Sequence, residues 1–116
     1  MGITFKEDCP DARNSKVYDI LKELREYGIQ PIVCDPVADA PDTKRFYGVD
    51  LVSIEAFKDL DCLIIAVAHK EFKALTNEDI EKMFKDEPNS QKVIVDVKGV
   101  RCKDEFKALG YRYWRL

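Results

Sequence analysis

Apolar and polar residues form blocks along this 116-residue chain, and each block has its own period. The first long block predicts a helix over about 15–27, because its apolar residues recur at the i, i+3, i+4, i+7 spacing of one buried face. These residues are Val17, Ile20, Leu21 and Leu24. Asn14 or Ser15 is expected to cap this helix with a side-chain oxygen, and Gly28 suits the position just after its end.

Continuous apolar runs at 61–68 and 92–97 are typical of parallel strands that are buried on both faces. Shorter runs predict further strands at 3–5, 31–36, 51–52 and 111–114. Thr76 and Asp79 have the spacing of a capping box, which predicts a helix with Ile80, Met83 and Phe84 turned inward. Other helical turns are expected at 43–47, 54–57 and 104–109.

Strands that alternate with helices predict an α/β fold. We expect a three-layer αβα sandwich around a parallel, Rossmann-like sheet of five to six strands in the order 3-2-1-4-5-6, with right-handed crossovers. Residues 51–52 count as the third strand, and without them the alternative is a flavodoxin-like sheet of five strands. The chain has the length of one domain. Its first strand is short for a central position, so a piece of a larger protein is expected.

Composition narrows the function. The net charge is −3 and no basic block is present, which speaks against nucleic acid and against an anionic membrane surface as partners. No apolar run has the length of a membrane span, and no signal peptide is evident. The four cysteines are widely spaced and His69 is the only histidine, so no metal site is expected. Free thiols favour a cytoplasmic chain.

Cations follow three of the predicted strands. Lys6 follows the strand at 3–5, His69 follows the strand at 61–67, and Lys98 follows the strand at 92–97. Because parallel strands end at one edge of their sheet, these residues are expected to meet there, together with Phe5 and Arg13. Anionic ligands of α/β folds bind at such an edge, between a strand end and a helix start.

Each of these residues also has a plainer interpretation, and the residue types alone do not decide. The loop after residue 5 is then a solvated turn, and Lys6 and Lys98 are surface lysines. Arg13 pairs with Asp11 or Asp8, and His69 bonds a backbone carbonyl. Phe5 packs in the core.

The stretch GITFKEDCPDARNSK resembles the motif that opens the C-terminal, UDP-binding domain of the UDP-glucose/GDP-mannose dehydrogenase family. It is most similar to the UDP-N-acetylhexosamine dehydrogenases of bacterial capsular and O-antigen polysaccharide synthesis. The pattern G-x-x-F-K-x-x-x-x-D-x-R-x-S is matched by Gly2, Phe5, Lys6, Asp11, Arg13 and Ser15. The resemblance covers essentially the whole chain. It implies that residues 1–116 are that domain, without the N-terminal NAD-binding and central domains.

The resemblance also implies roles for single residues. Phe5 and Lys6 match residues that contact the UDP-sugar, and Lys98 matches a basic substrate contact. Arg13 matches the arginine that approaches NAD across the cleft between domains, and His69 is a candidate contact at the same edge. The lysine at 98, in place of arginine, favours the N-acetylhexosamine branch. The family's catalytic cysteine precedes this segment, so no catalytic residue is expected here.

The implied function is that of an NAD-dependent UDP-sugar 6-dehydrogenase, which oxidises the C6 alcohol of the sugar to a carboxylate. No glycine-rich turn follows the first strand, so the main NAD site is expected elsewhere and the isolated chain is expected to be inactive. Its partners would be a UDP-sugar and the protein's own other domains. The full protein is expected as a homodimer or larger, and this chain as a monomer. The alternative is a free-standing nucleotide-binding or receiver-like regulatory module.

Overall fold

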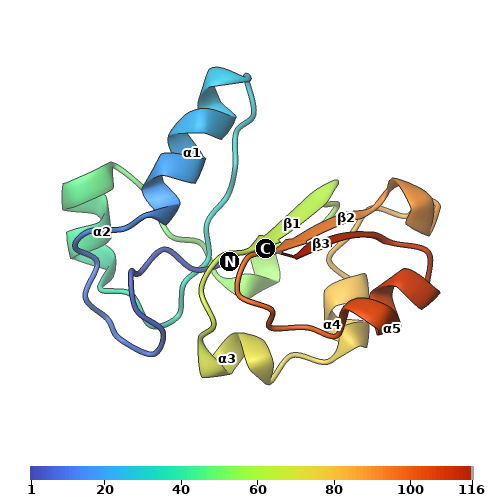
Figure 1. Cartoon of the computed structure of the whole chain (residues 1–116). Coiled ribbons are helices and arrows are strands. Elements are labelled where there is room, and N and C mark those ends of the chain that lie inside the picture. Colours follow the sequence, from blue (N-terminus) through green and yellow to red (C-terminus); the bar gives the residue numbers. More distant parts are fainter. Residues whose placement is uncertain (116) are drawn as a thin grey trace.

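The computed structural model describes residues 1–115 and shows short helices around a small parallel sheet (Figure 1). The helices and strands are α1 (Val17–Glu26), α2 (Ala40–Tyr47), the 3-10 helix η1 (Ile54–Ala56), β1 (Cys62–Ile65), α3 (Lys70–Lys73), α4 (Asn77–Glu81), the 3-10 helix η2 (Asn89–Gln91), β2 (Val93–Asp96), α5 (Lys103–Ala108) and β3 (Arg112–Arg115).

The sheet has the order β1-β2-β3, and both pairs are parallel. Its register places Ile65, Asp96 and Arg115 side by side at the carboxyl end of the three strands. The parallel α/β class predicted from the apolar runs is confirmed, and β1 and β2 lie inside the runs that predicted them. Both of these strands are shorter than the runs that predicted them.

Three extended segments lie next to one another beside β1, although none of them forms a regular strand. The Met1 amino group donates to the Ile64 carbonyl at 2.6 Å, and the Ala66 N–H donates to the Met1 carbonyl at 2.9 Å. On the other side of this first segment, the Gly2 N–H donates to the Cys34 carbonyl at 2.8 Å. Beyond that, residues 33 and 51 form an isolated parallel bridge. Residues 1–2 therefore lie between β1 and the segment around Cys34.

The strand predicted at 3–5 is wrong, because the chain turns away after Thr4. Gly2 has a φ of +91°, and a Cβ added to it would lie 2.6 Å from Cβ of Val67. Only glycine combines a left-handed backbone with so close an approach. The chain therefore makes its sheet-like bonds at residues 1–2 and then leaves the sheet.

Side-chain caps explain where two helices begin. The Asp39 carboxylate accepts a hydrogen bond from the Asp42 N–H at 2.9 Å, so α2 starts earlier than the predicted turn at 43–47. The predicted capping box is present, since Thr76 and Asp79 each accept from the other's backbone N–H. Ser15 accepts from the Tyr18 N–H at 3.3 Å, just ahead of α1.

Two apolar clusters form the core. The larger joins β1, β2 and β3 to α3, α4 and α5 and includes Ile65, Phe72, Ile80, Ile94 and Phe106. The smaller packs α1 and residue 49 against the extended segments and consists of Ile3, Leu21, Val33 and Val49. In Figure 1, α4 and α5 lie along one side of the sheet while α1 rises on the other. The loop of residues 5–13 lies outside both clusters, at the carboxyl end of β1.

Candidate functional site

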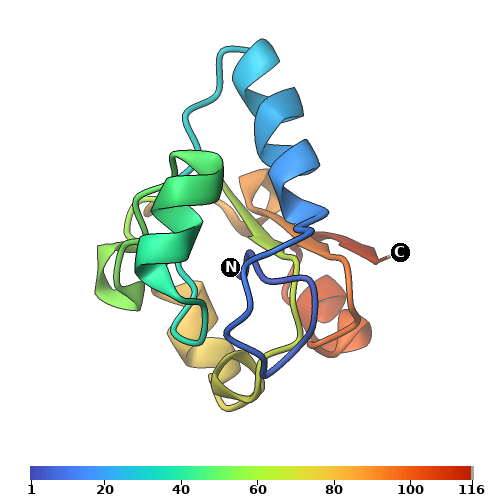
Figure 2. The same ribbon diagram turned by 90° about the vertical axis from the view of Figure 1, so that its left-hand side faces the viewer.

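The loop of residues 5–13 presents most of the predicted site residues to solvent. Phe5 is 52% exposed, so it is not a core residue in this structure. Lys6 and Arg13 are also exposed. Figure 2 shows this loop in dark blue, passing beside α3. On one exposed loop, an aromatic ring can pack against a base or a sugar while a cation binds a phosphate.

A buried carboxylate, Asp35, fixes the start of this loop. Its Oδ2 accepts hydrogen bonds from the N–H groups of Ile3 at 2.8 Å and Thr4 at 3.3 Å. Its Oδ1 accepts from the N–H groups of Val37 and Ala38, both at 2.9 Å. Burial alone would raise the pKa of Asp35, but these bonds and one from His69 outweigh it and lower the pKa.

His69 links Asp35 to the middle of the loop. Its Nε2 lies 2.9 Å from Oδ2 of Asp35 and 3.2 Å from Oγ1 of Thr4. Its Nδ1 accepts the Asp8 N–H at 2.9 Å, so the hydrogen of a neutral ring sits on Nε2. The Asp8 side chain in turn accepts the Lys70 N–H at 2.8 Å. One tautomer thus satisfies every contact of the ring.

This arrangement corrects the prediction of His69 as a contact at the exposed edge. The residue follows β1 as predicted, but its side chain is 0% exposed and both ring nitrogens have partners. The ring also packs on Phe72, with 5.4 Å between the ring centroids. His69 therefore holds the loop in place instead of facing a ligand.

Arg13 forms an ion pair with Asp11, which is one of the interpretations left open by the sequence. Its Nη2 donates to Oδ2 of Asp11 at 2.8 Å and its Nε donates to Oδ1 at 3.0 Å. Hydrogen bonds from Arg13 lower the pKa of Asp11 to about 2. The Arg13 side chain is still 72% exposed, so this cation remains accessible to a ligand or to another domain.

Lys98 lies in a turn that a second buried carboxylate holds. Asp96, the last residue of β2, accepts the N–H groups of Val100 at 2.9 Å and Arg101 at 2.8 Å. Lys98 itself is exposed. A Cβ added to Gly99 would lie 2.7 Å from Nη2 of Arg115, so the Arg115 guanidinium covers this turn. A second cation thus stands beside Lys98.

The backbone brings these turns to one edge. The Val97 N–H donates to the Ile65 carbonyl at 2.9 Å, and Ala66 is bonded to Met1. The turn with Lys98 and the segment leading to Lys6 therefore flank the carboxyl end of β1. Arg13 lies at the far end of the loop, where it is bonded to Asp11.

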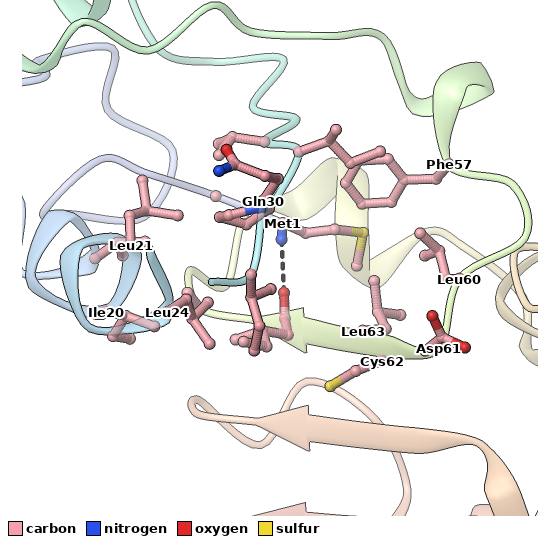
Figure 3. A pocket seen from close by; sticks show the side chains of 18 of the residues that line it. Met1, Ile20, Leu21, Leu24, Gln30, Phe57, Leu60, Asp61, Cys62 and Leu63 are labelled. Carbon is pink, nitrogen blue, oxygen red and sulfur yellow. Dashed lines mark hydrogen bonds between the residues drawn. The ribbon is translucent and has the colours of Figure 1, made fainter. Parts of the chain in front are cut away.

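Two cavities lie away from these cations. The larger, of about 450 Å³, is mostly apolar and lies between α1, residues 29–33 and β1 (Figure 3). The charged side chains of its lining are those of Asp59 and Asp61, which would repel a phosphate. The smaller, of about 360 Å³, has Asp35, Glu55 and Glu71 in its lining. The candidate anion site is thus an open surface on this domain.

Sequence reasoning missed Arg115 and the anchoring role of Asp35. The sequence signal for Asp35 was an acidic residue directly after an apolar run, which equally marks the end of a strand. Among residues 1–115, no group of three or more acidic, histidine or cysteine side chains could hold a metal ion. In the same range, no helix is long and apolar enough to cross a membrane.

Comparisons with known proteins found a matching family model and several relatives. A family model described as the UDP binding domain of the UDP-glucose/GDP-mannose dehydrogenase family matches residues 1–103. The UDP-N-acetyl-D-glucosamine 6-dehydrogenase of Pseudomonas aeruginosa is 45% identical over 105 residues, which are 90% of this chain and 24% of that protein. Protein CapL of Staphylococcus aureus is 39% identical over 116 residues, which are 100% of this chain and 26% of that protein.

A solved structure shares the fold. The NDP-N-acetyl-D-galactosaminuronic acid dehydrogenase of Methanosarcina mazei Go1 superposes with a TM-score of 0.82 at 24% identity. The match covers 98% of this chain and 23% of that chain. This chain thus spans about a quarter of the length of the proteins it matches.

Proposed function

The chain belongs to the UDP-glucose/GDP-mannose dehydrogenase family as a UDP binding domain, and on that premise we propose that it binds the UDP-sugar of an NAD-dependent 6-dehydrogenase. The longer protein would oxidise the C6 alcohol of a UDP-hexose or UDP-N-acetylhexosamine to the uronic acid for polysaccharide biosynthesis. The 45% identity to a UDP-N-acetyl-D-glucosamine 6-dehydrogenase favours the N-acetylhexosamine substrates.

The exposed loop after residue 4 carries this proposal. Phe5 and Lys6 contact the UDP-sugar, Phe5 through its ring and backbone and Lys6 through a phosphate. Among the described residues, no carboxylate forms an ion pair with Lys6 or Lys98. An exposed ammonium without such a partner gives up no protein ion pair when it binds a phosphate. Lys98 makes the second contact to substrate from the turn after β2.

Arg13 faces the cofactor from the other end of the loop. The residues of this chain do not form a complete dinucleotide site, because no glycine lies between Gly2 and Gly28 to let a pyrophosphate approach the backbone. We therefore assign NAD to another domain and give Arg13 one contact across the cleft, made from its 72% exposed side chain. No step of the reaction is derived from this contact.

The chemistry would also come from outside this chain. Burial raises the pKa of the Cys34 thiol, so this thiol is a poor nucleophile at neutral pH. Cys9 lies on the loop but outside any matching motif of the family. We therefore expect the isolated chain to bind UDP weakly and to show no dehydrogenase activity, because one wall of a cleft leaves much of the ligand in water. A cytoplasmic location remains a prediction from its free thiols.

The sheet of the longer protein would have the order 3-2-1-4-5-6. Backbone bonds support this order. They place residue 51 beside residue 33, residue 34 beside residues 1–2, and residue 1 beside the end of β1. The NAD-binding and central domains would then form the other wall of the cleft.

The test compares the longer enzyme with the 116-residue chain. The longer enzyme should form NADH from NAD and UDP-N-acetylglucosamine, and UDP should compete with that substrate. The chain alone should unfold in one cooperative thermal transition, bind UDP in an NMR titration and form no NADH. Failure of the longer enzyme to bind UDP would refute the proposal. Sustained turnover by the chain alone would refute the assignment of the nucleophile and cofactor site to other domains.

A further inference from the structure

Lys6 lies between two anchors of the loop. The Lys6 carbonyl accepts a hydrogen bond from Oγ1 of Thr4 at 2.9 Å, and two residues later the Asp8 N–H donates to Nδ1 of His69. Thr4 is itself held by Asp35. Both anchors therefore lead to the buried pair Asp35–His69, whose side chains are 0% exposed.

We propose that Asp35 and His69 are positioning residues that set the place of the Lys6 ammonium on the substrate surface. This inference rests on the proposed contact between Lys6 and the phosphates of UDP. Neither member of the pair touches the ligand. They act through the backbone on both sides of Lys6.

The ring of His69 is matched to this task at both nitrogens. Thr4 gives its hydroxyl hydrogen to Lys6, so its oxygen can only accept from the ring. The ring must therefore donate from Nε2, toward Thr4 and Asp35. It must also accept at Nδ1 from the Asp8 N–H, which a doubly protonated ring could not do.

The backbone at Asp8 shows why an anchor is needed there. Asp8 has a φ of +56°, a left-handed conformation that Asn and Asp adopt more often than other residues with a side chain, though less readily than Gly. Its N–H is held by His69, and its carboxylate accepts the Lys70 N–H at 2.8 Å. Without the acceptor on His69 the loop is free to relax toward an ordinary turn, which would move Lys6.

Two substitutions test the two ring nitrogens of His69 separately. In His69→Gln, the amide N–H can still reach Asp35, but the acceptor for the Asp8 N–H is lost. In His69→Asn, the amide oxygen stands near the position of Nδ1 and keeps that acceptor. We expect His69→Gln to weaken UDP binding to the longer enzyme roughly tenfold, as the loss of one hydrogen bond allows. His69→Asn should stay within about threefold of the parent on the same basis.

A double-mutant cycle with Lys6→Ala tests the mechanism, because two residues that act on one contact are not additive. Isothermal calorimetry with UDP is run on the parent, Lys6→Ala, His69→Gln and the double variant. If His69 acts through Lys6, the double variant binds UDP as weakly as Lys6→Ala alone. Phe72→Leu is the control, because it loosens the packing beside His69 and leaves the hydrogen bonds in place. It should lower the melting temperature but leave UDP affinity unchanged.

Thr4→Val is the second variant, for the case in which His69→Gln does not fold. It keeps the branched shape and removes the hydroxyl that bonds the Lys6 carbonyl and the His69 ring. A loss of about fivefold is therefore expected, and the loss should again be absent in the Lys6→Ala background. Unchanged UDP affinity in the folded variants, or losses that add fully to that of Lys6→Ala, would overturn the positioning role. If Lys6→Ala itself leaves UDP affinity unchanged, the proposed substrate contact fails, and the positioning role fails with it.

Discussion

The hydroxyl of Tyr113 donates a hydrogen bond to the carboxylate of Asp96, and both side chains are buried. Tyr113 lies on β3 and Asp96 ends β2. The same carboxylate accepts two N–H groups of the turn that displays Lys98. The carboxylate that holds the turn with Lys98 is thus also bonded to the neighbouring strand.

Tyr113→Phe should destabilise the domain by about 1.5–3 kcal/mol, because a hydrogen bond to a buried charged group is lost. Urea denaturation of the two proteins measures this difference. Tyr111→Phe is the matched control, because the buried Tyr111 hydroxyl has no hydrogen-bond partner among the described residues. Its removal should be neutral or stabilising. Equal losses in both variants would contradict the role of the Asp96 bond.

Titration of Tyr113 offers an independent readout of this bond. Burial, together with the hydrogen bond to Asp96, raises the pKa of Tyr113. The tyrosinate signal of this residue should therefore be absent at pH values where exposed tyrosines have ionised, near pH 10.

Lys6→Ala should weaken UDP binding to the longer enzyme by about one to two powers of ten, since a charge-assisted bond to phosphate contributes roughly 1.5–3 kcal/mol. Calorimetry with UDP at fixed ionic strength is the measurement. Lys22→Ala is the control, because Lys22 is an exposed lysine on α1 that pairs with Asp19. The loss in Lys6→Ala should shrink as salt is added. An unchanged affinity would remove Lys6 from the substrate site.

Arg13→Ala should return the pKa of Asp11 from about 2 toward its ordinary value of 3.8. The folded-state pKa is lowered, so the ion pair is fully formed above the ordinary value and is lost as pH falls through about 2. NMR titration of the Asp11 carboxyl carbon measures the shift. Hydrogen bonds from Thr76 lower the pKa of Asp79. None of these bonds involves Arg13, so Asp79 is an internal reference whose titration should be the same in both proteins. If Asp11 also titrates the same way in both proteins, the ion pair does not form in solution.

Thr76→Ala should destabilise the domain by about 1 kcal/mol, because the side-chain half of the capping box of α4 is lost. Thermal or urea unfolding gives the value. Ser53→Ala provides the comparison, since Ser53 precedes η1 without a side-chain cap. That substitution should change stability by less than about 0.5 kcal/mol, as is usual for surface positions.

Local pattern predicted much of the framework. The continuous run of apolar residues predicted β1, and the i, i+3, i+4, i+7 spacing predicted α1 to within a few residues of each end. The capping box at Thr76 was predicted because its partners are three residues apart in the chain. In each case the deciding contacts are local, so the sequence displays them directly.

Long-range bonds account for what pattern could not predict. Asp35 and His69 are separated by 34 positions, and His69 reaches Asp8 across 61. Nothing near Asp35 in the sequence shows that its carboxylate will be buried among four N–H groups. The residue types left Phe5 open between a ligand contact at the exposed edge and a core position, and pattern alone could not predict its exposure. It follows from the turn at Thr4, which carries Phe5 off the sheet.

The close approach of Gly2 to Val67 constrains how this sequence can vary. Because a methyl group at position 2 would collide with Cβ of Val67, the glycine that opens the G-x-x-F-K pattern serves packing and not phosphate binding. Positions 2 and 67 should therefore vary together among related sequences. A side chain at the first position should be accompanied by a smaller residue at the second or by a different path of the loop. Sequences that keep Phe and Lys but lose this glycine would display the same cation from a differently placed backbone.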